Sequence, residues 1–299
     1  MGKIDDAVQV LARVAIGIPV GGQVPTTVEL ATRANTAQGT VQAALGRLEE
    51  SGALRISSHG SRGRRVVSRD ISALWLASAG GALTGVMPLP DSREFSGLAT
   101  ALSDAAESRG IPLQLLFRQG STVRLQFLES GRVDFTVASA TVAHSQPGQT
   151  ASLTLAPHTY YQKDSVVVIT ASGREVGTPD RVPVDRSSHD HLQLTQSEFP
   201  NAQLVDAPYS FIPELVVSGE FDAAVWHRSA SSPLLIGSGI TIHPLRHRKS
   251  DAADSLDRAA IVWRSQDTAV GGVMSDVFTA ARLEKVQQEV MDGVRIPQF

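Results

Sequence analysis

Apolar residues recur every three or four positions along the N-terminal part of the chain, which is the spacing of one face of an α-helix. A first helix is predicted from Ile4 to about Ile16, a second from Thr26 to near Arg33, and a third, after a break, to about Glu50. Thr26 and Glu29 have the spacing of a capping box, in which a hydroxyl and a carboxylate each accept a backbone N–H. The second helix is therefore expected to begin at Thr26.

A β-hairpin is predicted directly after the third helix. Gly52 lies where a left-handed helix cap favours a residue without Cβ, and Leu54 to Ser57 has the composition of a strand. A glycine-containing turn at residues 60–63 and a return strand at Val66 and Val67 complete the hairpin. Its basic side chains are His59, Arg62, Arg64 and Arg65. Two short helices followed by a basic hairpin are the pattern of a winged helix-turn-helix, an α+β fold that binds double-stranded DNA.

In such a fold the third helix lies in the major groove, so its first turns supply the candidates for reading bases. These candidates are Gln38, Thr40 and Gln42, because glutamine pairs with the exposed edge of adenine. The arginines expected to hold phosphates are Arg33, Arg47, Arg62, Arg64 and Arg65. The alternative is a helical interaction module whose charges form a solvated surface.

Residues 3–68 resemble the DNA-binding domain of GntR-type bacterial repressors. The resemblance rests on four motifs, which are Pro25-Thr26-x-x-Glu29-Leu30-Ala31, Thr40-Val41-x-x-Ala44-Leu45-x-x-Leu48, Gly52 and the Gly-x-Arg-Gly turn. The chain departs from the family at Ala37 and Gln38, where a Ser-Arg pair usually opens the recognition helix. The resemblance implies that the head docks on DNA through this helix.

Helical and strand-like segments alternate in the rest of the chain. The first series comprises a helix at 91–109, a strand at 113–117, a helix at 121–130 and a strand at 133–138. The second comprises strands at 165–170 and 181–184, a helix at 190–199, a strand at 203–205, a helix at 211–218, strands at 223–226, 240–244 and 259–263, and a helix at 270–290. This alternation predicts right-handed crossovers and a largely parallel sheet.

The repeated series predicts two similar α/β lobes, with the chain crossing between them twice. We expect a DNA-binding domain at residues 1–70 and a two-lobed effector-binding domain at 71–299. Lobe one is expected at about 71–160 plus 248–299, and lobe two at about 161–247. Only residues 68–72 leave room for a linker, so the two domains are expected to be closely coupled.

The second domain resembles the type II periplasmic-binding-protein fold, which LysR-type regulators also use as an effector module. The segments that carry this resemblance are Gln119-Gly120-Ser121-Thr122-Val123-Arg124-Leu125 and Leu128-Glu129-Ser130-Gly131-Arg132-Val133-Asp134-Phe135. Together with Val86-Met87-Pro88-Leu89-Pro90, they make the whole chain similar to the YhfZ family of regulators. The resemblance implies a domain that senses a small molecule.

A ligand of an open α/β lobe binds beyond the carboxyl ends of the strands, where helix N-termini favour a carboxylate or phosphate. Small and hydroxyl residues follow the predicted strands at Gly120, Ser121, Ser139, Thr141, Ser188, Tyr209 and Ser210. Arg118 and Arg228 are candidates to hold the anion, and Tyr160 and Trp226 are candidates to stack on it. For each residue the alternative is an ordinary helix cap or a surface side chain.

Charge and composition support a two-part regulator. Residues 1–70 carry nine Lys or Arg and six Asp or Glu, whereas the remainder carries 18 and 24, so a basic head is joined to an acidic body. The absence of cysteine excludes disulfides and thiolate chemistry. The N-terminus has acidic residues where a signal peptide has bases, and no stretch is long enough to span a membrane, so a cytoplasmic location is expected.

No metal site, cofactor or enzymatic activity is expected. His189 and His191 are two residues apart and His243 and His247 are separated by Pro244, so neither pair resembles a zinc motif. One enzyme alternative takes the loop from Gly80 to Gly85 as a dinucleotide-binding turn after a strand at 74–77, but the glycine spacing does not match. The other is a metabolic enzyme on the same periplasmic-binding-protein-like scaffold, with the N-terminal helices as an interaction domain. The favoured hypothesis is a homodimeric regulator in which an anionic effector changes the spacing of two DNA-binding heads.

Overall fold

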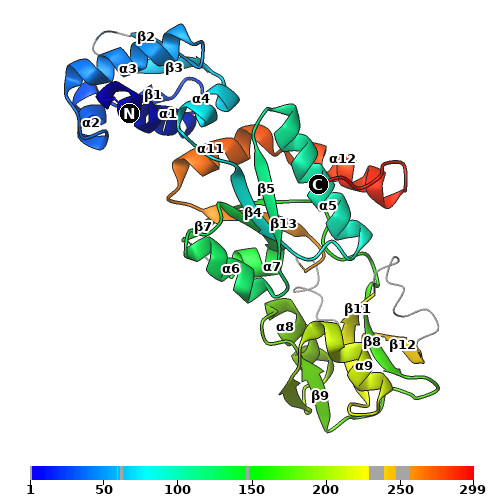
Figure 1. The fold of residues 1–299 in the computed structure, drawn as a ribbon. Coiled ribbons are helices and arrows are strands. Elements are labelled where there is room, and N and C mark those ends of the chain that lie inside the picture. The colour runs from blue at the N-terminus through cyan, green and yellow to red at the C-terminus, as the bar shows by residue number, and fades with distance from the viewer. Residues whose placement is uncertain (1, 59, 61–62, 146–147, 229–238, 247–255) are drawn as a thin grey trace. The chain divides into compact units, whose positions relative to one another are not determined.

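A computed structural model describes residues 2–58, 60, 63–145, 148–228, 239–246 and 256–299 (Figure 1). Its contacts divide the chain into two compact units. The first comprises Met1–Leu83, Asp104–Gln114 and Trp263–Thr279, and the second comprises Thr84–Ser103, Leu115–Val262 and Ala280–Phe299. The first unit thus joins the N-terminal head to later segments of the chain, and the expected domain boundary at residue 70 stays a prediction.

The head contains the three predicted helices and the predicted hairpin. Its helices are α1 (Lys3–Ile16), α2 (Thr27–Arg33) and α3 (Gln38–Glu50), and its strands are β1 (Gln23–Val24), β2 (Leu54–Ser58) and β3 (Arg64–Arg69). Strand β3 lies between β1 and β2 and pairs with both in antiparallel fashion. Strand β1 is an addition to the prediction, since two residues carry no periodicity.

Local hydrogen bonds explain why these elements begin and end where they do. The N–H of Glu29 donates to the Thr26 hydroxyl at 3.3 Å, and the N–H of Thr26 donates to the Glu29 carboxylate at 2.7 Å, so the predicted capping box is confirmed. Gly52 has a φ of 75°, which confirms the left-handed turn after α3. The predicted inner face of α3 is also confirmed, because Val41, Leu45 and Leu48 are buried.

The segment at 74–77, taken as a strand in the enzyme alternative, is instead part of helix α4 (Ile71–Ala77). The carboxylate of Asp70 accepts the N–H of Ala73 at 3.0 Å and so caps this helix. Leu74 and Trp75 are buried, and the indole N–H of Trp75 donates to the carbonyl oxygen of Gly81 at 3.0 Å. The glycine loop therefore follows a helix, which removes the premise of a dinucleotide-binding turn.

The head is seated on helix α11 (Thr268–Val277), which belongs to the same unit. A Cβ on Gly272 would collide with the backbone carbonyl oxygen of Ile16 at the end of α1. Arg69 donates to this same oxygen and forms an ion pair with Asp276 at 2.9 Å. The guanidinium of Arg69 is almost completely buried, so it links α1, β3 and α11 in a region that excludes water.

Gly272→Ala is expected to separate α1 from α11, because the added methyl group has no space beside the backbone of Ile16. We expect the free energy of unfolding to fall by about 2 kcal/mol, measured by urea denaturation. Gly271→Ala is the matched control, since its Cβ would meet only the Trp263 side chain, at 3.2 Å. Equal stability of the two variants would contradict the close packing of α1 on α11.

A five-stranded sheet forms the core of the first lobe, with the strand order β5-β4-β6-β13-β7. Its strands are β4 (Leu83–Met87), β5 (Leu113–Phe117), β6 (Phe135–Ser139), β7 (Thr150–Thr154) and β13 (Ala259–Arg264). The described helices of this part of the chain include α5 (Arg93–Ser108), α6 (Ser121–Glu129), α7 (Ala140–His144) and α12 (Ala280–Met291). Strand β13 lies between β6 and β7, which confirms that the chain returns to the first lobe.

The second lobe differs from the predicted largely parallel arrangement. Strand β8 (Val166–Ala171) pairs in antiparallel fashion with both β11 (Ala223–His227) and β12 (Ile240–Pro244). Among the described residues of this lobe, β9 (Arg181–Val184) and β10 (Gln203–Asp206) form the parallel pair, and helix α8 (His189–Glu198) connects them as predicted. Successive crossover connections do not join β8, β11 and β12. The alternation of helices and strands in the sequence therefore did not determine whether these strands run parallel or antiparallel.

Two helices were predicted with the wrong extent. Residues 270–290 form α11 and α12 rather than one helix, because Phe278 is extended, with a φ of −103° and a ψ of 99°, and is buried. The helix predicted at 211–218 begins as a short 3₁₀ segment (Tyr209–Phe211) and continues as α9 (Ile212–Val217).

Among the described residues, no helix is both long and apolar enough to cross a membrane.

Candidate functional site

A cavity of about 330 Å³ lies within the second unit and is lined by residues of both lobes. Six of the eleven predicted ligand-binding residues line it, namely Gly120, Tyr160, Ser188, Tyr209, Ser210 and Trp226. We call this cavity the cleft. Its lining also includes residues that the sequence analysis did not select, among them Asp91, Phe95, Arg124, Tyr161, His191 and His227.

The other five predicted residues lie outside the lining. Arg118 and Arg228 are exposed, and their backbone N–H groups donate to the carbonyl oxygens of Met87 and Ser165. Both arginines follow strands, as predicted, but their exposed side chains leave the cleft without the expected clamp.

Two of the three remaining hydroxyls form hydrogen bonds within the protein. Ser121 accepts the N–H of His189 at 3.0 Å, and Ser139 donates to Asp190 at 2.8 Å. The hydroxyl of Thr141 is buried and has no hydrogen-bond partner among the described residues.

Arg124 is the basic residue of the lining that the sequence analysis did not select. It lies on α6, is only 3% exposed, and lines the cleft. Its guanidinium donates to the carbonyl oxygens of Val137 and Arg118 and to the hydroxyl of Tyr160, at 3.2, 2.9 and 3.1 Å. The available signal was its spacing, because Arg124 is four residues before the buried Leu128 and so lies on the inner face of the helix.

Aromatic side chains make up a large part of the lining. The rings of Tyr209 and Trp226 stack with centroids 4.2 Å apart and planes 10° apart. Tyr160 contacts Phe95 edge to face, with centroids 5.1 Å apart. Burial raises the pKa of Tyr160 to about 12, so its hydroxyl is neutral at physiological pH.

The two histidines of the cleft are also neutral. His191 accepts the N–H of Asp185 at Nδ1 and lies 3.0 Å from the carbonyl oxygen of Val225 at Nε2, so the proton is on Nε2. Burial lowers the pKa of His191, and burial also lowers the pKa of His227, to about 4. Among the described residues of the lining, Arg124 and Asp91 are therefore the groups that can carry charge near neutral pH, and burial raises the pKa of Asp91.

Hydrogen bonds connect the two lobes beside the cleft. The N–H of Thr122 donates to the carbonyl oxygen of Ser187 at 3.0 Å, next to the contact between Ser121 and His189. Asp190 of α8 is 1% exposed and accepts the hydroxyl proton of Ser139, at the end of β6. Burial raises the pKa of Asp190 to about 6, although Ser139 and the nearby charge of Arg124 act in the opposite direction.

The raised pKa of Asp190 predicts a pH-dependent contribution to stability. Because the native state holds this proton more tightly than the unfolded state, the contribution is present at low pH and is lost as pH rises through about 6. Asp190→Asn keeps an acceptor for Ser139 but does not ionise. We expect the free energy of unfolding of Asp190→Asn, relative to that of the native sequence, to increase by about 1 kcal/mol between about pH 5 and about pH 7.5, measured by urea denaturation.

The control for this measurement is Asp222→Asn, which removes a carboxylate whose side chain is 69% exposed. Its stability relative to the native sequence is expected to change little over the same range. A pH-independent difference for Asp190→Asn would show that the buried carboxyl is not the group that titrates.

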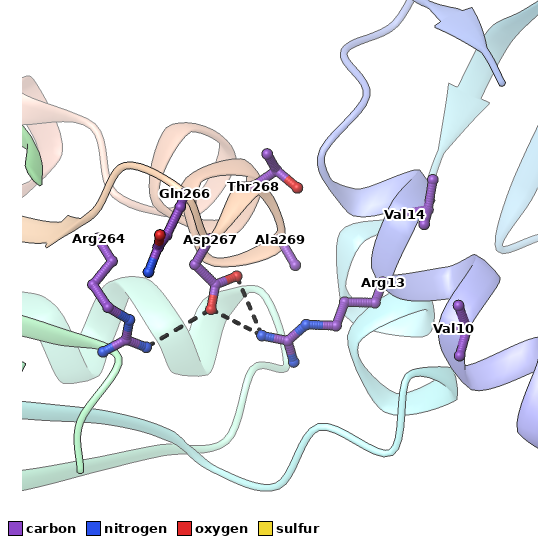
Figure 2. Close-up of a pocket in the computed structure, with 8 residues that line it drawn as sticks. All are labelled: Val10, Arg13, Val14, Arg264, Gln266, Asp267, Thr268 and Ala269. Atoms are coloured by element: carbon purple, nitrogen blue, oxygen red, sulfur yellow. Dashed lines mark hydrogen bonds and ion pairs between the residues drawn. The ribbon is translucent and has the colours of Figure 1, made fainter. Parts of the chain in front are cut away.

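A second cavity, of about 410 Å³, lies in the first unit between α1 and the start of α11 (Figure 2). There Arg13 Nη2 lies 3.2 and 2.9 Å from the two carboxylate oxygens of Asp267, and Arg264 lies 3.8 Å from the same group. Asp267 also accepts the N–H of Val270 at 3.1 Å. Because this carboxylate is already engaged, the cavity is best explained as part of the contact between the head and α11.

On the head, the predicted base-reading residues lie on the first turns of α3. Gln38 and Gln42 are exposed, and Thr40 is partly exposed. Helix α3 begins without a side-chain cap, since Ala37 occupies that position. The two glutamines are therefore available for contact with a partner.

The predicted phosphate-binding arginines differ in their surroundings. Arg33 is exposed, Arg65 is exposed and donates to the carbonyl oxygen of Gly21 at 2.7 Å, and Arg64 donates to Thr27 at 3.1 Å. Arg47 forms an exposed ion pair with Asp5 at 2.7 Å. Arg62 lies outside the described residues.

The described residues contain no group of three or more histidine, aspartate or glutamate side chains positioned to hold a metal ion. His59 and His247 lie outside the part of the chain that the structure describes.

Comparison with known proteins agrees with this architecture. The YhfZ C-terminal domain family matches residues 70–299. The Escherichia coli K12 protein YhfZ is 30% identical over 296 residues, which cover 97% of this chain and 95% of that protein. The crystal structure of YhfZ from Shigella flexneri matches with a TM-score of 0.63 and 27% identity, covering 77% of this chain and 98% of the other.

A more distant match supports the two-lobed fold alone. An amino acid ABC transporter substrate-binding protein from Streptococcus pneumoniae, solved bound to L-arginine, aligns with a TM-score of 0.52 and 14% identity. The alignment covers 76% of this chain and 94% of that protein. The C-terminal part of the chain thus has the periplasmic-binding-protein-like arrangement of two α/β lobes.

Proposed function

The chain belongs to the YhfZ family, and we propose that it is a transcription regulator whose head binds double-stranded DNA and whose cleft binds a small anionic metabolite. In this proposal the head is a GntR-like winged helix-turn-helix, and two copies of the chain form a homodimer in the cytoplasm. The proposal rests on one observation: a single chain combines a helix that exposes Gln38 and Gln42 with a separate cavity lined by a buried arginine.

The shape and charge of the head support DNA binding. Helices α2 and α3 are joined by a short turn, and the hairpin of β2 and β3 follows them, as in a winged helix-turn-helix. The head also carries a net positive charge, while the rest of the chain is acidic. Arg33 and Arg65 are the exposed arginines best suited to phosphate contacts, whereas Arg47 would first have to leave Asp5.

The cleft supports the binding of a small molecule. Its volume of about 330 Å³ is at the lower end of the range of small-ligand pockets, and both lobes contribute to its lining. Arg124 supplies a positive charge that is screened from bulk water. An anion is the ligand that such a charge favours, and Arg124 takes the role that the sequence analysis gave to Arg118 and Arg228.

A continuous stretch of chain connects the second unit, which contains the cleft, to the seat of the head. Strand β13 runs from the second unit into the first, and α11, on which α1 packs, follows it directly. A ligand that changes the position of β13 would therefore act on the head through α11. In a homodimer this would change the spacing of the two recognition helices and hence the affinity for two half-sites.

We expect binding without turnover, and without a cofactor. A turnover assay with bound metabolites separates this proposal from the alternative of an enzyme on the same scaffold.

The DNA-binding proposal makes different predictions for two kinds of head residue. Arg65→Ala should weaken binding to all duplexes alike and reduce the slope of log affinity against log salt by about 1, because it removes one phosphate contact. Gln42→Ala should instead change the preferred sequence. Fluorescence anisotropy with duplexes from upstream of the chain's own gene, at several salt concentrations, measures both effects.

Lys285→Ala is the matched control for charge, since Lys285 is an exposed cation on α12, outside the head. Its affinity and salt slope should equal those of the native sequence. Failure of the native chain to bind any duplex at low salt would overturn the proposal and favour an interaction module.

A further inference from the structure

The walls of the cleft favour a flat ring. Tyr209 and Trp226 form a parallel stacked pair on the second lobe, and Phe95 and Tyr160 form an edge-to-face pair within the same lining. The imidazole of His227 lies 4.7 Å from the ring of Tyr161, centroid to centroid, and adds another aromatic contact to this group. Aromatic side chains arranged around one cavity offer faces and edges to an aromatic ligand.

The charges of the lining favour a single negative group. Arg124 is the one permanent cation among the described residues that line the cleft, because His191 and His227 are neutral. Asp91 is the carboxyl group in the same lining, and it would repel a second anionic group of the ligand. A monocarboxylate matches this balance better than a phosphate or a dicarboxylate does.

Unpaired donors in the cleft indicate where the carboxylate binds. Arg124 donates to described residues through three of its five N–H groups, so the guanidinium can form further hydrogen bonds. Trp226 is 7% exposed, yet its indole N–H has no partner among the described residues. A buried donor without an acceptor is costly, and a ligand oxygen would remove this cost.

We propose that the cleft binds a small aromatic monocarboxylate, with its ring among the aromatic side chains and its carboxylate oxygens on the N–H groups of Arg124 and Trp226. This inference rests on the proposed function, since it names the ligand class of the same cleft. It adds the aromatic ring, the single charge and the role of Trp226, none of which the DNA-binding proposal requires.

Isothermal titration calorimetry of the full chain with four matched compounds tests the ligand class. Phenylacetate is expected to bind, whereas cyclohexylacetate, which lacks the aromatic ring, and phenylacetamide, which lacks the charge, should bind at least about tenfold more weakly. Phenylglycine adds an amino group to phenylacetate. Binding of phenylglycine without binding of phenylacetate would overturn the inference in favour of an amino acid.

Two tryptophan variants test the position of the carboxylate. Trp226→Phe keeps a ring beside Tyr209 but removes the N–H, and it should weaken phenylacetate binding by about tenfold. Trp75→Phe is the control, because the indole of Trp75 donates to Gly81 and does not line the cleft. An unchanged dissociation constant in Trp226→Phe, with an unchanged melting temperature, would overturn the assignment.

The titrations need no DNA, so they separate the two proposals. Equal binding of cyclohexylacetate and phenylacetate would overturn the aromatic ligand while leaving an anionic effector in place. Absence of DNA binding, in the anisotropy measurement above, would overturn the regulator and leave the ligand class intact.

Discussion

The cleft depends on how the protein satisfies the buried guanidinium of Arg124. A positive charge that is removed from water must be hydrogen-bonded, and here its N–H groups are held by the end of β5, by β6 and by Tyr160, which precedes the second lobe. These contacts fix the inner wall of the first lobe at the point where the chain leaves it. The same hydrogen bonds hold the positive charge of Arg124 beside the aromatic rings that line the cleft.

The head depends on a different constraint, which is the close approach of two backbones. Gly272 allows α11 to contact the last turn of α1, and the nearly buried Arg69 joins β3 to both helices. The head is therefore not a free module on a flexible linker, because segments distant in sequence form one compact unit with it. Such a seat is what a regulator needs if a ligand-dependent change in α11 is to reach the recognition helix.

Local signals predicted the head well, and long-range contacts explain what was missed. The capping box at Thr26, the inner face of α3 and the turn at Gly52 are set by neighbouring residues, so the sequence was sufficient for them. The antiparallel strands of the second lobe, and the contact of Asp190 with Ser139 across 51 positions, depend on tertiary structure. The predicted anion-binding arginines, Arg118 and Arg228, follow strands, whereas Arg124 reaches the cleft from the inner face of a helix.

The account requires that cleft and head respond to each other, and a linkage measurement tests this most directly. The dissociation constant for a labelled upstream duplex is measured with and without saturating phenylacetate, and that for phenylacetate with and without saturating duplex. The account predicts that both constants change by the same factor, of about fivefold or more, because coupling between two sites is reciprocal. If both ligands bind and neither constant changes, the cleft and the head act independently, and the account is contradicted.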